Sequence, residues 1–275
     1  MKRIYFFTLV SLLMTTQLFA QTTSPTFILI HGGWHGAWCW NKVLPLLKEK
    51  GIKAIAIDLP SHGVDKTPVA SVTFDDYVNK VVDAANSVEG SVILLGHSSS
   101  GIPIAQAAER LTLEKVSSLV FLDAFMPQNG ETVFSLVEKY PNKPDGNKGA
   151  ALAESLIFSA DKKSTTLDLD KVRELLYHDC SEADVAYAKA HLGAQPMATQ
   201  LTPVSVTEKN YGVIPKYYLL CTDAKDFDKT KISTNVPCKK IYRLRSSHSP
   251  FFSMPDKLVE ILGDVYKQST LAVTQ

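Results

Sequence analysis

The sequence contains a serine, a histidine and several aspartates at positions that suit nucleophilic catalysis. Their places relative to the predicted strands and helices suggest a role for each. Ser98 follows a strongly apolar run, residues 92–95, and precedes an alanine-rich segment of helical pattern. A strand, a tight turn and a helix in this order lift a serine hydroxyl off the end of the strand. The helix aims free N–H groups and its positive dipole end at the place where an oxyanion would form. Ser98 is therefore the candidate nucleophile.

The turn around Ser98 departs in one place from the usual G-x-S-x-G spacing. Gly96 stands two residues before the serine, but Ser100 stands two residues after it and Gly101 follows one position later. Small residues are needed here because the serine backbone is strained and bulky neighbours would add clashes. Serine is still small, so we expect the turn to tolerate Ser100.

A serine hydroxyl is a weak nucleophile until a base takes its proton, and His248 is the best placed of the seven histidines to do so. It lies in the loop at residues 245–250, after the last predicted strand, as the chain order serine, acid, histidine requires. His31 and His35 are four residues apart, as some metal ligands are, but they lie on a glycine-rich turn without a nearby carboxylate. We interpret both as structural, and we expect neither a metal nor an organic cofactor.

The elements that must position these groups alternate along the chain. Apolar runs of strand length occupy residues 27–30, 53–58, 92–95, 116–122, 216–221 and 240–244, and helical patterns occupy residues 41–50, 74–88, 102–110 and 255–266. Strands that are apolar almost throughout argue for a parallel sheet covered on both faces. Right-handed crossovers place the carboxyl ends of such strands at one edge, where ligands bind. Ser98 and the turn at residues 32–33 should meet there.

Between about residues 125 and 200 this alternation stops. Proline and glycine interrupt the segment, and helical stretches are predicted near residues 131–139, 150–159, 170–178 and 182–192. An insertion of this length after a strand predicts a mostly helical cap over the sheet edge. We expect one domain over residues 21–275, with the cap at about residues 125–200.

The first twenty residues have the pattern of a secretory signal peptide. Lys2 and Arg3 precede an apolar stretch at residues 4–13, and Ala20 ends a segment that resembles a cleavage site. The stretch is short for a membrane span, so an uncleaved anchor is the less favoured alternative. We expect cleavage after Ala20 and a protein exported to the periplasm or the medium, without a membrane association after cleavage.

Composition narrows the range of partners. The chain of 275 residues has 29 basic and 28 acidic residues, and a net charge of +1 gives no electrostatic case for nucleic acid. Four cysteines permit three full disulfide pairings, and free buried thiols are an equal alternative. No two of them have the C-x-x-C spacing of zinc or redox sites: Cys39, Cys180, Cys221 and Cys238.

Several motifs together resemble one branch of a known superfamily. Residues 31–40 (HGGWHGAWCW), 96–98 (GHS), 124–127 (AFMP) and 247–250 (SHSP) are similar to the plant methylesterases and hydroxynitrile lyases of the α/β-hydrolases, and to their bacterial esterase relatives. The resemblance covers nearly all of the chain after residue 20. It implies the α/β-hydrolase fold, a mainly parallel sheet flanked by helices, with a helical cap inserted after the strand at residues 116–122.

The resemblance also implies how Ser98 and His248 are assisted. The backbone N–H of Ser99, directly after the nucleophile, would be one donor of the oxyanion hole. Gly33, in the turn after the first strand, matches the family's position for the other donor.

The acid of the triad is the one uncertain assignment. The resemblance places it after the strand at residues 216–221, where related chains have roughly C-T-x-D-K, but the aligned position here is Ala224. We predict that Asp223, one residue earlier, is the acid. Asp123, after the strand at residues 116–122, is the main alternative, and Asp226 is the third candidate.

These features predict a serine carboxylesterase that hydrolyses small-molecule esters through an acyl-enzyme, acting as a monomer or homodimer, with methyl and aryl esters among the candidate substrates. The lyases of this branch resemble one another in a lysine after the catalytic histidine and a threonine after the first histidine of the glycine turn. Ser249 and Gly32 stand at those positions, which disfavours lyase chemistry. The displaced acid leaves a non-catalytic small-molecule binding protein as the alternative from another class.

Overall fold

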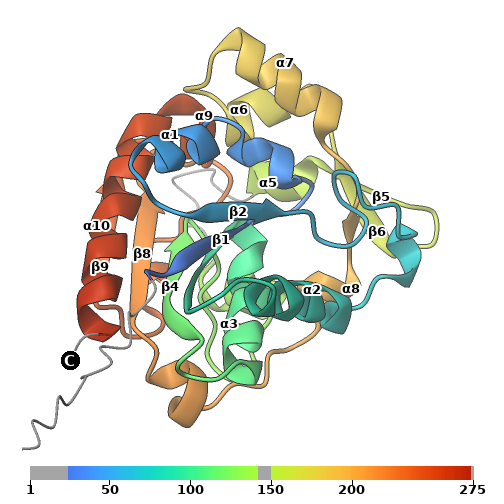
Figure 1. Cartoon of the computed structure of the whole chain (residues 1–275). Coiled ribbons are helices and arrows are strands. Elements are labelled where there is room, and N and C mark those ends of the chain that lie inside the picture. Colours follow the sequence, from blue (N-terminus) through green and yellow to red (C-terminus); the bar gives the residue numbers. More distant parts are fainter. Residues whose placement is uncertain (1–23, 142–149, 274–275) are drawn as a thin grey trace, which may run out of the picture.

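The computed structural model describes residues 24–141 and 150–273, and a six-stranded parallel sheet forms the centre of this part of the chain (Figure 1). The strand order is β2-β1-β3-β4-β8-β9. β1, β3 and β8 are buried along their whole length, as their continuous apolar runs predict. The strands are β1 (Thr26–Ile30), β2 (Ala54–Ile57), β3 (Val92–His97), β4 (Val116–Leu122), β8 (Lys216–Cys221) and β9 (Lys240–Leu244).

Helices cover the two faces of the sheet (Figure 1). Because successive strand residues point to opposite faces, Ile28 and Leu94 pack in one apolar cluster while Leu29 and Leu95 pack in the other. The first cluster includes side chains of α2 (Phe74–Asn86) and α3 (Gly101–Arg110), and the second includes side chains of α1 (Val43–Glu49), α9 (Pro250–Ser253) and α10 (Pro255–Val273). Short helical turns complete the described chain: η1 (Ala37–Trp40), η2 (Val69–Ser71), η3 (Ser98–Ser100), η4 (Glu208–Gly212) and η5 (Ile232–Thr234).

The cap is inserted between β4 and β8, as predicted, but it is not purely helical. Its elements are α4 (Val133–Lys139), α5 (Ala150–Glu154), β5 (Leu156–Phe158), β6 (Ser164–Leu167), α6 (Val172–Leu176), α7 (Glu182–His191), β7 (Gln195–Pro196) and α8 (Ala198–Leu201). The helix predicted over residues 150–159 is wrong beyond Glu154, because the chain turns at Lys162, which has a φ of 58°, and pairs β5 with β6. β7 joins β6 from a distant part of the sequence, which local periodicity cannot reveal.

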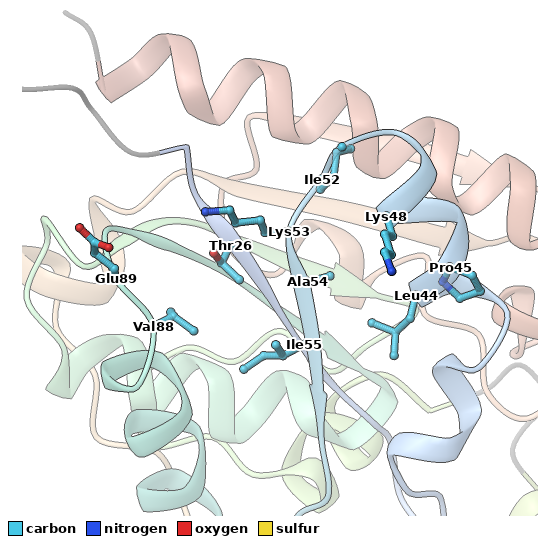
Figure 2. Close-up of a pocket in the computed structure, with 11 residues that line it drawn as sticks. Thr26, Leu44, Pro45, Lys48, Ile52, Lys53, Ala54, Ile55, Val88 and Glu89 are labelled. Atoms are coloured by element: carbon cyan, nitrogen blue, oxygen red, sulfur yellow. The ribbon is translucent and has the colours of Figure 1, made fainter.

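A broad hollow lies at the amino-terminal ends of β1 and β2, away from the edge where Ser98 emerges (Figure 2). Its volume is about 730 Å³, and Thr26, Ile52 and Lys53 line it at the strand ends. Ligands of open α/β sheets bind outside the carboxyl ends of the strands. This hollow is large, but it lies at the opposite ends of the strands, so we do not take it as the candidate site.

The structure bears on the cysteines but not on the predicted signal peptide. The predicted signal peptide, residues 1–20, lies outside the described residues, so it stays a prediction, as do export and the oligomeric state. In residues 24–141 and 150–273 no helix is both long and apolar enough to cross a membrane. All four cysteines are free, so the disulfide alternative is not realised.

The unusual spacing around Ser98 has a steric explanation. The Ser100 hydroxyl donates a buried hydrogen bond to the carbonyl oxygen of His31, which fixes the elbow to the end of β1. A Cβ atom on Gly101 would lie 2.0 Å from the carbonyl oxygen of Phe125, where the chain passes over the elbow after β4. The glycine is therefore needed one position later than the usual motif places it.

We predict that Gly101→Ala destabilises the fold by about 1–3 kcal/mol or more, because the added methyl group forces the Phe125 backbone away from the elbow. Denaturant unfolding of the purified protein measures this change. Gly193→Ala is the matched control, since a Cβ atom there meets nothing within 4 Å. Equal stability of the two variants would contradict the steric explanation.

Candidate active site

The nucleophile turn has the strained backbone that its role predicts. Ser98 has a φ of 56°, in the left-handed region that non-glycine residues rarely adopt. Its carbonyl oxygen accepts a hydrogen bond of 3.0 Å from the Phe125 backbone, which helps to hold this conformation. A Cβ atom on Gly32 would lie 2.8 Å from the Ser98 Cβ, so the first glycine of the neighbouring turn is required by close approach. The chain segments that follow β1 and β4 thus hold the strained backbone of Ser98 in place.

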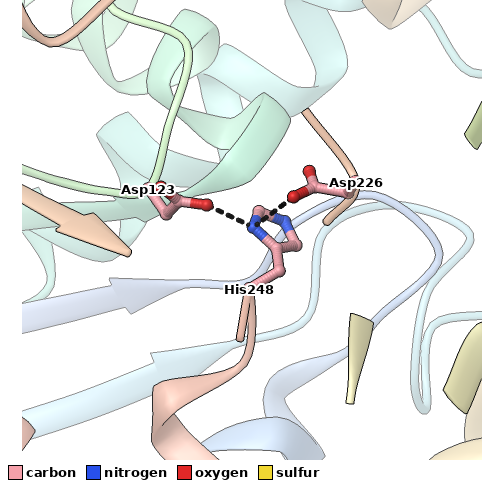
Figure 3. A group of neighbouring side chains, drawn as sticks. All are labelled: Asp123, Asp226 and His248. Atoms are coloured by element: carbon pink, nitrogen blue, oxygen red, sulfur yellow. Dashed lines mark hydrogen bonds and ion pairs between the residues drawn. The ribbon is translucent and has the colours of Figure 1, made fainter. Parts of the chain in front are cut away.

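His248 lies at the same edge, in the loop between β9 and α9, and Asp123 holds its ring. The two atoms His248 Nδ1 and Asp123 Oδ2 are 2.7 Å apart, and both side chains are buried (Figure 3). The second carboxylate oxygen of Asp123 accepts a hydrogen bond of 3.1 Å from the Cys221 backbone at the end of β8. Because Nδ1 is engaged, Nε2 is the ring nitrogen left for proton transfer.

The prediction that Asp223 orients His248 is corrected by this geometry. The Asp223 carboxylate forms an exposed ion pair of 3.2 Å with Arg245. The reason lies in the backbone: the N–H of Thr222 bonds to the Leu244 carbonyl, and the N–H of Asp223 bonds to the Ser246 carbonyl. These bonds continue the β8–β9 pairing past the strand ends, and the carboxylate of Asp223 is left on the solvent side. The main alternative, Asp123, takes the place beside His248.

Asp226, the third candidate acid, also faces the imidazole. Its Oδ1 atom is 3.6 Å from His248 Nδ1 (Figure 3). Its Oδ2 atom is 2.6 Å from the Lys229 ammonium. Lys229 is fully buried and also lies 3.1 Å from Asp123. Two carboxylates and an imidazole are donor types that metals use, but Lys229 already supplies the positive charge between the carboxylates. We therefore assign no metal site to this group.

The charges in this buried cluster stabilise one another. Burial disfavours the ionised form of Asp123, but the Lys229 ammonium and the hydrogen bond with His248 hold the pKa of that carboxyl below its ordinary value. Burial likewise disfavours a charged Lys229, but Asp123 and Asp226 raise its pKa above the ordinary value. Both directions agree with an ionised Asp123 beside a charged lysine.

Gly33 and Ser99, the predicted oxyanion donors, are neighbours in the structure. A Cβ atom on Gly33 would lie 3.4 Å from the Ser99 hydroxyl oxygen. The turn is held from the cap, because the backbone N–H of Trp34 donates to the side-chain oxygen of Gln195 in β7 at 3.2 Å. The Gly193 backbone N–H donates to the Trp34 carbonyl at 2.8 Å. The turns that carry Gly33 and Ser99 thus lie next to each other beside Ser98.

Ser98 and His248 line one cavity of about 150 Å³ between the sheet edge and the cap. Its remaining wall is mostly apolar and comes largely from the cap: Val133, Phe134, Val137, Leu152, Leu156, Leu176 and Met197. Among the described residues that line it, Asp226 is the one carboxylate, and there is no lysine or arginine. The cavity can therefore enclose a compact apolar group next to the serine.

Sequence reasoning missed two residues that shape this site. Lys229 follows Asp226 by three positions, and a lysine in a charged loop carries no signal that distinguishes burial from solvation. Gln195 lies in β7, a two-residue strand without a periodic pattern. Both gain their roles from contacts between remote parts of the chain.

Comparison with known proteins agrees with this geometry. Residues 27–261 match the alpha/beta hydrolase family. The chain belongs to this family. The resemblance and the fold predicted from the sequence are thereby confirmed.

Individual relatives of this hydrolase are esterases and a lyase. It is 33% identical to the putative methylesterase 11 of Arabidopsis thaliana over 88% of its length, and spans 64% of that longer protein. It is 30% identical to the alpha-hydroxynitrile lyase of the same plant, over 87% of this chain and 96% of the lyase. Among solved structures, a pyrethroid hydrolase from Sphingobium faniae is 26% identical, with a TM-score of 0.79 over 88% of this chain and 97% of that one. The hydrolase is thus related to methylesterases and other esterases.

Four further histidines pack around the active-site turns and are buried. Burial lowers the pKa of His35 to about 3 and that of His62 to about 4, and it lowers the pKa of His31 and His97 well below the ordinary value. The His35 ring lies 2.7 Å from the Tyr177 hydroxyl, and the His62 ring lies 2.6 Å from the Tyr77 hydroxyl. The Leu59 backbone N–H donates to His31 Nε2 at 3.1 Å, and this contact and that of His35 fit the interpretation of both residues as structural.

We predict that the free energy of unfolding falls as the pH is lowered from about 6.5 to 5. In this window the unfolded chain takes up protons on these histidines, while the folded protein keeps them neutral because their pKa values are lowered. Each histidine contributes a slope of up to about 1.4 kcal/mol per pH unit. Denaturant unfolding at several pH values measures the slope, and His62→Gln should make it smaller. A flat profile would contradict the assignment.

Proposed function

We propose that this hydrolase is a serine carboxylesterase for small neutral esters. The observation that supports it best is the pairing of His248 Nδ1 with Asp123 at 2.7 Å, since His248 and Ser98 line the same cavity. An imidazole held in this way can act as a general base toward a serine at a strained turn. The names of the methylesterase and pyrethroid hydrolase relatives point to the same reaction class.

In this mechanism the Ser98 hydroxyl attacks the ester carbonyl while Nε2 of His248 accepts its proton. The backbone N–H groups of Gly33 and Ser99 stabilise the oxyanion, and the imidazolium then gives its proton to the departing alcohol. Water repeats the sequence on the acyl-enzyme and releases the acid. Asp123 stays ionised throughout and stabilises the imidazolium, as its lowered pKa allows.

The cavity favours compact and uncharged substrates. A volume of about 150 Å³ accommodates a group of roughly the size of a benzene ring. Its mostly apolar wall would bind methyl or aryl esters, and no lysine or arginine among the described lining residues could pair with an anionic one. Small aryl and methyl esters are therefore the first substrates to test.

Two alternatives lose support from the site. The lyase alternative needs a positive charge for the leaving cyanide, yet no described lysine or arginine lines the cavity. The binding-protein alternative was motivated by the displaced acid, and Asp123 now supplies a carboxylate beside His248.

We predict that a fluorophosphonate forms one stoichiometric adduct with the purified protein, because an activated serine attacks the phosphorus centre. Intact-protein mass spectrometry measures the adduct, and Ser98→Ala should abolish it together with turnover of p-nitrophenyl acetate. Ser87→Ala, at an exposed serine that ends α2, should label fully. The absence of both adduct and turnover from the unmodified protein would support the binding protein instead.

We predict that Asp123→Asn lowers kcat/KM by about 10²–10⁴, because the imidazole loses its orientation and the negative charge beside it. Asp223→Asn should change kcat/KM less than twofold, since its carboxylate faces Arg245 in solvent. Steady-state kinetics with p-nitrophenyl acetate provides the measurement, with circular dichroism to establish that both variants fold. The reverse order of effects would contradict the assignment of the acid.

A further inference from the structure

The buried cluster at His248 holds one more carboxylate than the mechanism uses. Asp123 already hydrogen-bonds to Nδ1, yet Asp226 Oδ1 lies only 3.6 Å from the same nitrogen (Figure 3). That oxygen is buried and has no hydrogen-bond partner among the described residues. A second negative charge in a buried site would favour the charged imidazolium over the neutral imidazole that a base requires. Something in the cluster must offset it.

Lys229 is placed to do this. Its side chain is fully buried, and its ammonium lies 2.6 Å from Asp226 and 3.1 Å from Asp123. The sum of two carboxylates and one ammonium is a single negative charge, the same as that of one aspartate. We propose that Lys229 is a positioning residue for His248, which cancels the charge of Asp226 so that the imidazole faces the net charge of one carboxylate. This inference rests on the proposed esterase function.

The titratable groups packed against the cluster from other elements do not disturb this balance. Burial lowers the pKa of His97 at the end of β3 and that of His35 in the first turn, so both are neutral. Burial raises the pKa of Tyr218 and that of Cys221 in β8, so both keep their protons.

Four charged groups lie at the margin of the cluster. Asp179 of the cap accepts a hydrogen bond of 2.8 Å from the Ser247 backbone, and the pair of Asp223 with Arg245 is exposed to solvent. Asp228 is exposed on the same loop as Lys229 and accepts a hydrogen bond from the backbone of Thr230. Exposed charges are screened, so they act on the imidazole much less than the buried cluster does.

The charge balance predicts opposite effects for the two members of the pair. Lys229→Met leaves two carboxylates facing the ring, and the first proton goes to His248 because imidazole ordinarily binds protons roughly two pH units above aspartate. Asp226→Asn leaves one carboxylate and one ammonium, which no longer favour the imidazolium. The double variant restores a single negative charge.

The experiment is the pH dependence of kcat/KM for p-nitrophenyl acetate in these three variants. On the acid side of the profile, kcat/KM falls as the base becomes protonated, and we call this fall the acid limb. The acid limb should move up by about one pH unit or more in Lys229→Met and down by a similar amount in Asp226→Asn. In the double variant it should return to the wild-type position. Lys225→Met is the matched control. Lys225 lies on the same loop as Lys229, but it pairs with Glu174 at the surface, so its substitution should not move the acid limb.

NMR titration of the His248 ring in the same variants measures the charge balance without turnover. If Ser98 is not a nucleophile, turnover fails in every variant while the opposite NMR shifts remain, so the two proposals fail separately. The double variant removes both buried charges together and keeps the test decisive where Lys229→Met alone does not fold. Shifts in one direction for both single variants, or a double variant that stays shifted, would overturn the role of Lys229.

Discussion

The hydrogen bond between Asp123 and His248 is the interaction on which the active-site geometry depends. It joins the end of β4 to the loop after β9, two segments separated by more than a hundred residues. The parallel sheet makes this contact available, because β4, β8 and β9 are neighbours in it and all end at the same edge. Ser98 leaves that edge from β3, and the cap closes the resulting cavity.

Burying this bond has an electrostatic cost that the surrounding residues must offset. A carboxylate taken out of water is stable only with good partners, and Asp123 has three: the His248 ring, the Cys221 backbone and the Lys229 ammonium. The same ammonium holds Asp226, so one lysine serves both acids. An isolated salt bridge would be weak evidence for stability, but here the ionised groups surround the candidate base and set its environment.

The sequence predicts those parts of the protein that local pattern encodes. Strand ends at Cys221 and Leu244 were predicted to the residue, and the elbow follows from small residues around Ser98. The choice of Asp223 as the acid was wrong, because the hydrogen bonds that turn Asp223 outward join two distant segments and leave no local pattern. β7 of the cap was missed for the same reason, since it pairs with β6 across about thirty residues. Lys229 shows the same limit, because nothing in its local sequence distinguishes a buried lysine from a surface one.

A crystal structure of the protein after reaction with a fluorophosphonate tests the central claim most directly. The account predicts phosphorus bonded to Ser98 Oγ, with a phosphonyl oxygen within hydrogen-bond distance of the backbone N–H groups of Gly33 and Ser99. It also predicts His248 Nδ1 on Asp123, with Asp223 still paired with Arg245. A modified serine elsewhere, or an imidazole turned to Asp223, would contradict it.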